Sequence, residues 1–261
     1  MAVMQWLAVQ LAVLATNTPA PFSAAYTLEG SAQSFVRYPK FYHSFENAIS
    51  FQFKSAAPTG LILYTDDGKL YGNFIEISLT DGRLTARFRI GKGRKQSELK
   101  LLQIAEPMVA DDQWHTVTLS QFYENVKLQM DAEQVLDRLR QNDFSFGVYQ
   151  SNAHVYMGGL PEAMSDISLS SPMSAHLPHF AGSIRNLVYR ILPHGVTAPH
   201  MLDSKGVRHT DDDYCSHSGQ VLCLNGGFCY STDDGPKCNC EHTDFMGRRC
   251  RTVFELIARS G

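Results

Sequence analysis

All six cysteines of the chain lie between positions 215 and 250, close to the end of its 261 residues. Zinc ligands usually come as cysteine pairs separated by about two to four residues, and the one close pair, Cys238 and Cys240, is tighter than that. A segment of about 40 residues has too little core to fold unaided, so we expect disulfides. Spacing alone does not choose among the pairings that six cysteines permit.

Two sequence features accompany these cysteines. Asn225-Gly226-Gly227 precedes the third cysteine, and Phe245-x-Gly247 precedes the sixth. With them, residues 215–250 resemble an epidermal-growth-factor-like (EGF-like) module. The resemblance implies the disulfides Cys215–Cys229, Cys223–Cys238 and Cys240–Cys250. Because disulfides persist in oxidising compartments, we expect the whole chain to be extracellular.

The N-terminal sequence also indicates an extracellular protein. Residues 6–15 are a short apolar run followed by small residues, which predicts a signal peptide over residues 1–25, cleaved after Ala15 or Ala25. A basic segment before the run is missing, and the alternative is an apolar helix. No later segment reaches the roughly 18 apolar residues of a membrane span. We therefore expect a secreted protein, or a cell-surface one if a C-terminal part beyond this sequence carries an anchor.

The segment from position 28 onward is predicted to be rich in β-strands. Short apolar or alternating runs follow one another, separated by turn signals. The clearest turn is the Asp-Gly pair at 81–82, which lies between two alternating runs and predicts a hairpin. The run after it places four apolar residues on one face: Leu84, Ala86, Phe88 and Ile90. Many short strands in about 170 residues without cysteine predict an all-β sandwich with its own core.

Six local sequences resemble a laminin G domain of the laminin–neurexin–sex-hormone-binding-globulin (LNS) type. They occur in that family's order, at residues 28–31, 60–64, 81–84, 112–115, 155–161 and 180–187. A laminin G domain followed by one EGF-like module resembles the N-terminal unit of an α-neurexin. The implied fold is an antiparallel jelly-roll β-sandwich, concanavalin-like, that binds ligands with the loops at one rim.

The resemblance also divides the chain. It places the laminin G domain at residues 28–192 and the EGF-like module at residues 215–250. Residues 193–214 between them are rich in Pro, Gly, His, Ser and Asp without an apolar period, which predicts a linker. Residues 251–261 form a C-terminal tail, and we expect it to be truncated because a further laminin G domain follows this module in α-neurexins.

Laminin G domains often hold one Ca²⁺ at the rim, and the resemblance implies where it would bind. Carried over by position, the side-chain ligand falls on Asn73 and the carbonyl ligands on Ile90 and Val148. The usual side chain is aspartate, and asparagine lacks the charge that sets much of the affinity for a hard cation. We expect at most a weak site, which Asp66 or Asp67 could strengthen. The alternative is that Asn73 is a turn residue entering a strand.

A basic surface forms the second candidate site. It is built from one face of the expected strand at 83–90 and the loop that follows. Its members are Arg83, Arg87, Arg89, Lys92, Arg94 and Lys95. Such a density of charge could bind the sulfates of heparan sulfate or an acidic protein. The alternative is an ordinary solvated face, because a strand with an apolar inner face needs a soluble outer one.

Two further motifs have structural interpretations. Trp114, in the sequence Asp-Gln-Trp-His, is expected to anchor the core, as large aromatics in β-sandwiches usually do. His176 and His179 are three residues apart, which would suit zinc on a helix, but Pro178 between them argues against a helix.

The sequence argues against an enzyme. It contains no Gly-x-Ser-x-Gly and no His-Glu-x-x-His, and Glu76 is the only acid of its strand, whereas glycosidases need two carboxylates. A net charge of -3 argues against a nucleic-acid partner. We expect an adhesion or recognition module that binds an extracellular protein or glycan, and the neurexin resemblance implies synaptic cell adhesion. The alternative is a carrier with an apolar pocket between the sheets, similar to the hormone-binding globulins.

Overall fold

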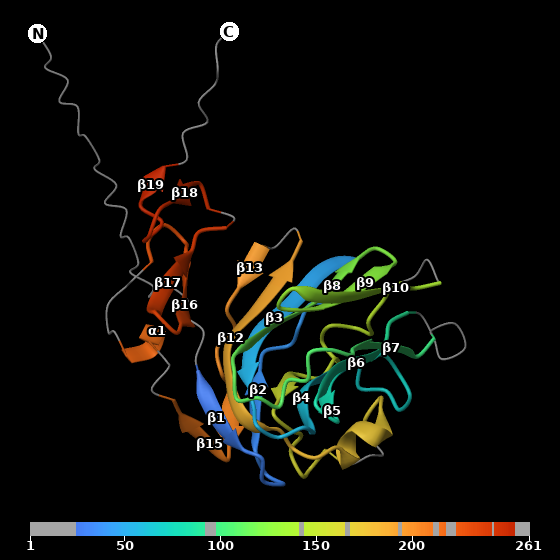
Figure 1. Ribbon diagram of the computed structural model, residues 1–261. Helices are drawn as coiled ribbons and strands as arrows, with labels where there is room; N and C mark the ends of the chain where they lie inside the picture. The colour runs from blue at the N-terminus through green and yellow to red at the C-terminus, as the bar shows by residue number, and fades with distance from the viewer. Residues whose placement is uncertain are drawn as a thin grey trace, which may run out of the picture.

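Two antiparallel β-sheets packed face to face make up most of the molecule, and a small cysteine-rich module lies beside them (Figure 1). The computed structural model describes residues 25–91, 98–140, 144–164, 168–192, 195–210, 214–217, 223–241 and 243–253. The predicted signal peptide at residues 1–25 therefore falls almost wholly outside the described residues. The predicted all-β sandwich is confirmed.

The first sheet has the strand order β10-β9-β8-β3-β12-β1-β15, with β13 paired to β12. Its strands are β1 (Tyr26–Glu29), β3 (Glu46–Lys54), β8 (His115–Phe122), β9 (Asn125–Met130), β10 (Glu133–Arg138), β12 (Ala181–Ile191), β13 (Gly195–Thr197) and β15 (Val207–His209). The first and last strands of the chain's sandwich thus lie together at one side of this sheet.

The second sheet has the order β14-β2-β11-β4-β5-β6-β7. Its strands are β2 (Phe35–Tyr38), β4 (Gly60–Asp66), β5 (Phe74–Thr80), β6 (Arg83–Arg89), β7 (Lys100–Ile104), β11 (Val155–Met157) and β14 (Asp203–Lys205). A short 3-10 helix, η1 (Pro172–His176), belongs to the connection between β11 and β12.

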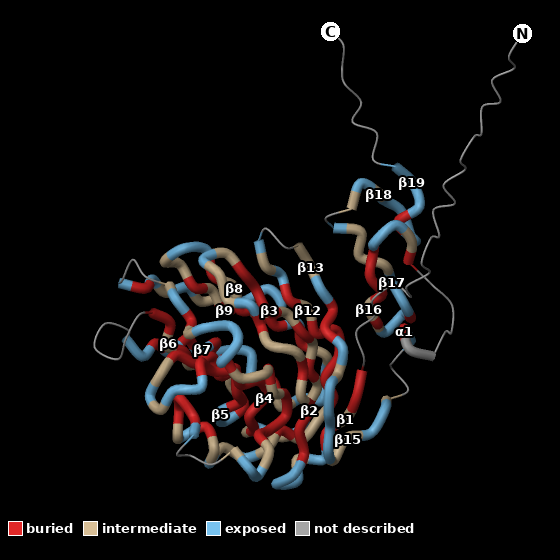
Figure 2. The backbone as a smooth tube through the Cα atoms, turned by 180° about the vertical axis from the view of Figure 1, so that it is seen from behind, coloured by how far each residue is buried: buried red, intermediate tan, exposed pale blue. Residues whose placement is uncertain are grey.

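The alternating pattern of the sequence accounts for the core. In β6, Leu84, Ala86 and Phe88 are buried, whereas Arg83, Arg87 and Arg89 on the other face are only partly covered. The hairpin from β5 to β6 turns at Asp81 and Gly82, with φ angles of 51° and 75°, which two-residue turns of this kind require. Figure 2 shows buried residues concentrated along the strands of both sheets. The core between the sheets therefore comes from strand alternation.

The outer face of the second sheet is covered as well. Leu160 and Leu169 pack there against Tyr64 and Phe74 in a second, smaller apolar cluster. The backbone of this covering segment is also bonded to the sheet, because the N–H of Leu61 in β4 donates to the carbonyl of Pro178 at 2.8 Å. Residues 160–164 and 168–179, which we call the strap, therefore bury a sheet face that would otherwise meet solvent.

Part of the predicted linker belongs to the sandwich, so the linker prediction for residues 193–214 needs correction. β13 pairs with β12, β14 with β2, and β15 with β1. These strands have three residues each and lie at or beside the sheet edges, where their polar side chains remain largely exposed. Edge strands need no apolar face, and this is why the sequence lacked a strand signal here.

The cysteine-rich module consists of one helical turn and two hairpins. Its elements are α1 (Tyr214–His217), β16 (Phe228–Thr232), β17 (Gly235–Asn239), β18 (Phe245–Met246) and β19 (Thr252–Val253). Disulfides join Cys215 to Cys229, Cys223 to Cys238 and Cys240 to Cys250. The first three cysteines are buried and form the small core of the module, which matches the need of so short a segment for covalent support. β19 extends this module into the predicted tail.

Trp114 lies outside the core, contrary to the prediction. The guanidinium carbon of Arg185 lies 4.0 Å from the centroid of its ring, and the amine of Lys54 lies 5.3 Å from it. Strand alternation gives the inward position to the next residue, His115, which is buried and packs against Phe53 at 5.5 Å between ring centroids. The indole thus forms cation–π contacts on the outer face of the first sheet.

His115 is clamped between two carboxylates. Its Nδ1 lies 2.8 Å from Asp131 Oδ2, and its Nε2 lies 3.1 Å from Asp111 Oδ1. Both ring nitrogens face acceptors, which favours the doubly protonated imidazolium. Burial opposes protonation, but the hydrogen bonds to Asp131 and Asp111 outweigh it and raise the pKa of His115 above its ordinary value.

This clamp predicts a pH-dependent contribution to stability. Because the pKa is higher in the folded state, the contribution is complete below about pH 6.5, the unfolded value, and is lost as pH rises through the folded pKa. We therefore expect His115→Gln to destabilise the protein more at about pH 5.5 than at about pH 8. Urea unfolding of the parent and the variant at both pH values measures this, with the exposed His200→Gln as control. Equal losses at both pH values would contradict the clamp.

Candidate functional site

Four connecting segments meet at one end of the sandwich, and we call this end the rim. They are residues 39–45, 67–73, 122–124 and 144–152. The amine of Lys40 donates to the carbonyl of Tyr149 at 3.4 Å, and the N–H of Tyr123 donates to the carbonyl of Phe45 at 2.7 Å. A Cβ added at Gly147 would lie 2.5 Å from the Cβ of Asp67, so the segments 67–73 and 144–152 approach closely.

Asn73, the predicted calcium ligand, ties the segment 67–73 to the segment 144–152. Its side chain is buried at the start of β5, and its Nδ2 donates to the carbonyls of Gly91 at 2.9 Å and Ser145 at 3.1 Å. The N–H of Gly91 donates to the same Ser145 carbonyl at 3.1 Å. The amide therefore bridges the start of β5, the end of β6 and the segment 144–152.

The other predicted calcium ligands are the carbonyls of Val148 and Ile90, and their role in an ion site stays a prediction. The carbonyl of Val148 accepts the N–H groups of Ser151 at 2.9 Å and Asn152 at 3.0 Å within its own turn. Ile90 is buried and its side chain lines a cavity of about 10 Å³ between the sheets. Among the described residues, no group of three or more His, Cys, Asp or Glu could hold a metal ion.

Asp66 and Asp67, which could have strengthened a calcium site, bind the strap. The N–H of Ser170 donates to Asp66 Oδ2 at 2.9 Å, and the hydroxyl of Ser170 donates to Asp67 Oδ1 at 3.1 Å. Tyr64 adds a hydrogen bond to Asp66 at 2.8 Å. Burial raises the pKa of Asp66, and these hydrogen bonds partly offset that effect. Both carboxylates therefore have structural partners.

The described arginines of the predicted basic surface also have intramolecular partners. Arg87 lies 3.1 Å from the buried carboxylate of Glu76, Arg89 donates to the carbonyl of Tyr71 at 2.7 Å, and Arg83 donates to that of Ala105 at 3.2 Å. The other members, Lys92, Arg94 and Lys95, lie outside the described residues. Binding of a sulfated glycan on this face stays a prediction, and Glu76 neutralises part of its charge.

Exposed aromatic side chains gather at the rim, and sequence reasoning missed them. The set, which we call the rim aromatics, is Tyr42, Phe45, Phe122, Tyr123 and Tyr149, each between 43% and 56% exposed. They pair across segments, with 5.5 Å between the ring centroids of Tyr42 and Tyr149 and 5.1 Å between those of Phe45 and Tyr123. Tyr42, Phe45, Tyr123 and Tyr149 lie in connections outside the alternating runs, and this was the available signal. Large exposed aromatics in a cluster are typical of binding surfaces.

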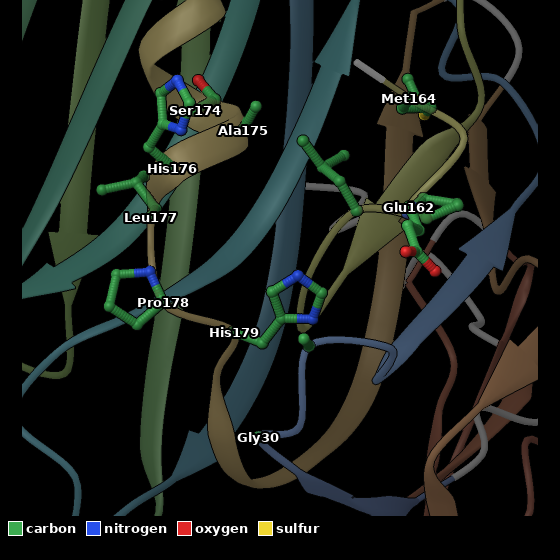
Figure 3. A pocket seen from close by; sticks show the side chains of 12 residues that line it. Gly30, Glu162, Met164, Ser174, Ala175, His176, Leu177, Pro178 and His179 are labelled. Carbon is green, nitrogen blue, oxygen red and sulfur yellow. The ribbon is translucent and has the colours of Figure 1, made fainter. Parts of the chain in front are cut away.

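A surface groove of about 560 Å³ lies between the strap and the turn from β1 to β2. Figure 3 shows His176 and His179 at separate places along it, with Leu177 and Pro178 between them. The Nδ1 of His179 donates to the carbonyl of Ser34 at 2.9 Å, which fixes that ring. The two histidines therefore belong to a mixed polar and apolar groove.

The space between the sheets gives no support to the carrier alternative. Large buried side chains fill it, Phe51, Phe53 and Phe88 among them. The cavity beside Ile90 has room for about one water molecule. A drug-sized ligand needs about 300 Å³ or more.

The cysteine-rich module contacts the outer face of β12 (Figure 1). Asn186 Nδ2 donates to the carbonyl of Ser231 at 2.7 Å, and the N–H of Ser231 donates back to Asn186 Oδ1 at 2.9 Å. Arg185 pairs with Asp233 at 2.9 Å, and Arg190 pairs with Glu241 at 2.7 Å, although this last pair is exposed. The buried contact is therefore centred on Asn186 and Ser231.

Comparisons with known proteins agree with the fold. The laminin G domain family matches residues 53–191, more than half of the chain, and a family described as Otogelin-like N-terminal matches residues 223–254. The mouse laminin alpha1 chain, domains LG4-5, superimposes with a TM-score of 0.55 at 16% identity, over 71% of this chain and 46% of that one. No helix within the described residues is long and apolar enough to span a membrane.

Sequence relatives are longer proteins. The chain is 31% identical over 252 residues to Neurexin 1 of Drosophila melanogaster, which covers 87% of this chain and 13% of that protein. It is 32% identical over 203 residues to Neurexin-2 of Homo sapiens, with coverages of 77% and 11%. The chain thus spans a small fraction of the length of these relatives. The EGF-like character of the cysteine-rich module stays a prediction.

Proposed function

Because the chain belongs to the laminin G domain family, we propose that it is an extracellular recognition module of the neurexin type that binds a protein partner through the rim aromatics. The observation that carries the proposal is the cluster itself. Five aromatic side chains from three different segments lie exposed at one end of the sandwich, next to the bridge made by Asn73. Side chains such as tyrosine and phenylalanine supply large contact area at low cost in conformational entropy.

The adjacent module supports the same function. Its buried contact is centred on Asn186 and Ser231 in the middle of β12, outside the four rim segments. We propose that the module is EGF-like and acts as a spacer held in place against the sandwich. The neurexin relatives suggest cell adhesion at synapses as the setting, and the proposed location is the cell exterior.

Substitution at the rim tests this function. We expect Tyr42→Ser combined with Tyr123→Ser to weaken binding of the labelled full chain to neuronal surfaces by about tenfold or more, because each aromatic can contribute over about 1 kcal/mol. Met108→Ser is the control, since Met108 is 52% exposed but lies beside Gly82, at the hairpin turn away from the rim segments.

The same assay separates the classes of ligand. Loss of binding after mild protease treatment of the cells supports a protein partner, and loss after heparinase supports a sulfated glycan instead. If the rim variant binds as well as the parent, or if Met108→Ser weakens binding equally, the rim is not the recognition surface.

A further inference from the structure

The amide of Asn73 joins two of the rim segments, 67–73 and 144–152, and the end of β6. Its two N–H groups are both used, one on the carbonyl of Gly91 and one on the carbonyl of Ser145. These carbonyls belong to segments that are far apart in sequence, and the side chain that joins them is buried. Carbonyl oxygens only accept hydrogen bonds, so the nitrogen of the amide must be the atom that faces them.

This arrangement has the wrong polarity for a bound cation. A calcium ion would need oxygen atoms of the ligands directed at it, including the side-chain oxygen at position 73. Here N–H groups with partial positive charge point at the carbonyls of Gly91 and Ser145. Turning the amide around would break both hydrogen bonds, and asparagine would bring no negative charge in return. The residues present therefore do not fit the calcium site that the resemblance implied.

We propose that the Asn73 amide replaces a bound cation, so that the rim is held in its binding conformation, and recognises its partner, without calcium. The claim that the partner is recognised without calcium rests on the proposed function of the rim. The claim that the amide holds the rim without calcium does not, because it concerns only how three segments of the chain are joined.

Replacement by aspartate tests the structural part. Asn73→Asp keeps the shape of the side chain but directs carboxylate oxygens at two carbonyls. In the presence of a chelator we expect the midpoint of thermal unfolding to fall by about 5–10 °C, since two buried hydrogen bonds become repulsive contacts. Millimolar Ca²⁺ should restore most of this loss, because the variant then has the carboxylate that the ion requires. The parent should show the same midpoint with Ca²⁺ and with chelator.

Two further variants make the outcome unambiguous. Asn73→Ala removes the hydrogen bonds without adding charge, and its lower midpoint should not respond to Ca²⁺. Asn47→Asp is a matched control, because Asn47 is also buried and donates its amide to the carbonyl of Ser44 within its own turn. We expect no rescue of that variant by Ca²⁺.

Several results would overturn the proposal. A parent midpoint that rises with Ca²⁺, or heat released when Ca²⁺ is titrated into the parent chain, shows that the ion binds despite the amide. An Asn73→Asp variant as stable as the parent in chelator shows that the amide does not hold the rim. Both readouts need no partner, so they remain decisive even if the rim aromatics prove not to bind one.

Discussion

Replacing Glu76 with alanine is expected to lower the free energy of unfolding by about 3–5 kcal/mol, the usual cost of breaking a buried ion pair on one side. The carboxylate is 1% exposed and lies 3.1 and 3.3 Å from Nη1 of Arg87, whose side chain is itself 18% exposed. The hydroxyl of Ser174 in η1 donates to the same carboxylate. Alanine would leave the guanidinium without its partner and detach one contact of the strap.

A double-mutant cycle separates the ion pair from simple loss of packing. Glu76→Leu and Arg87→Leu should each be strongly destabilising, because each leaves one charge buried and unpaired. The double variant should be more stable than the sum of the two losses predicts, since no uncompensated charge remains. Urea unfolding measures all four proteins. Additive losses would show that the pair is not coupled, and a loss below about 1 kcal/mol for the single variants would show that solvent screens it.

Asn186→Ala is expected to release the cysteine-rich module from the sandwich, because it weakens the contact between them by about 2–6 kcal/mol. The change leaves the buried N–H and carbonyl of Ser231 without partners, at about 1–3 kcal/mol each. Asn186 also has a φ of 60°, in a region that asparagine adopts more readily than alanine.

Hydrogen exchange reports this release at a single amide. In the parent, the N–H of Ser231 is bonded to Asn186 and should exchange slowly. In Asn186→Ala it should exchange at least about tenfold faster, whereas amides bonded within the hairpin of β16 and β17 keep their rates because the disulfides still hold the module. Asn125→Ala, at the start of β9, is the control. An unchanged rate at Ser231 would show that the module stays docked without the amide.

Local sequence was sufficient for the main strands of the sandwich and for the disulfides of the cysteine-rich segment. Alternation over residues 83–90 predicted which side chains of β6 enter the core, and the Asp-Gly pair at 81–82 predicted the hairpin turn. The core side chains of β6 and the hairpin turn both depend on interactions within a few residues, and a local sequence pattern is sufficient to predict these. Trp114 shows the limit, because the alternation that buries His115 sends the indole outward, and the Arg185 that covers it is remote in sequence.

The candidate site was less predictable from sequence than the strands, because its geometry depends on segments that are distant along the chain. The sequence identified Asn73 as the position where a ligand would stand, but the direction of its amide is set by the carbonyls of Gly91 and Ser145, which other loops supply. The rim aromatics come from segments distant in sequence, and the contact of Phe45 with Tyr123 exists only when β3 and β8 are paired.

What the sequence determined by itself was the class of fold, the positions of the main strands along the chain and the need for disulfides near the C-terminus, because apolar period, turn residues and cysteine density act locally. What only the tertiary structure decided was which polar residues are buried. Glu76 lies on the face of β5 that alternation would leave to solvent, and it is buried because the strap crosses that face. The alternation within a strand indicates which of its faces is apolar, but it gives no information about a distant segment that covers the other face.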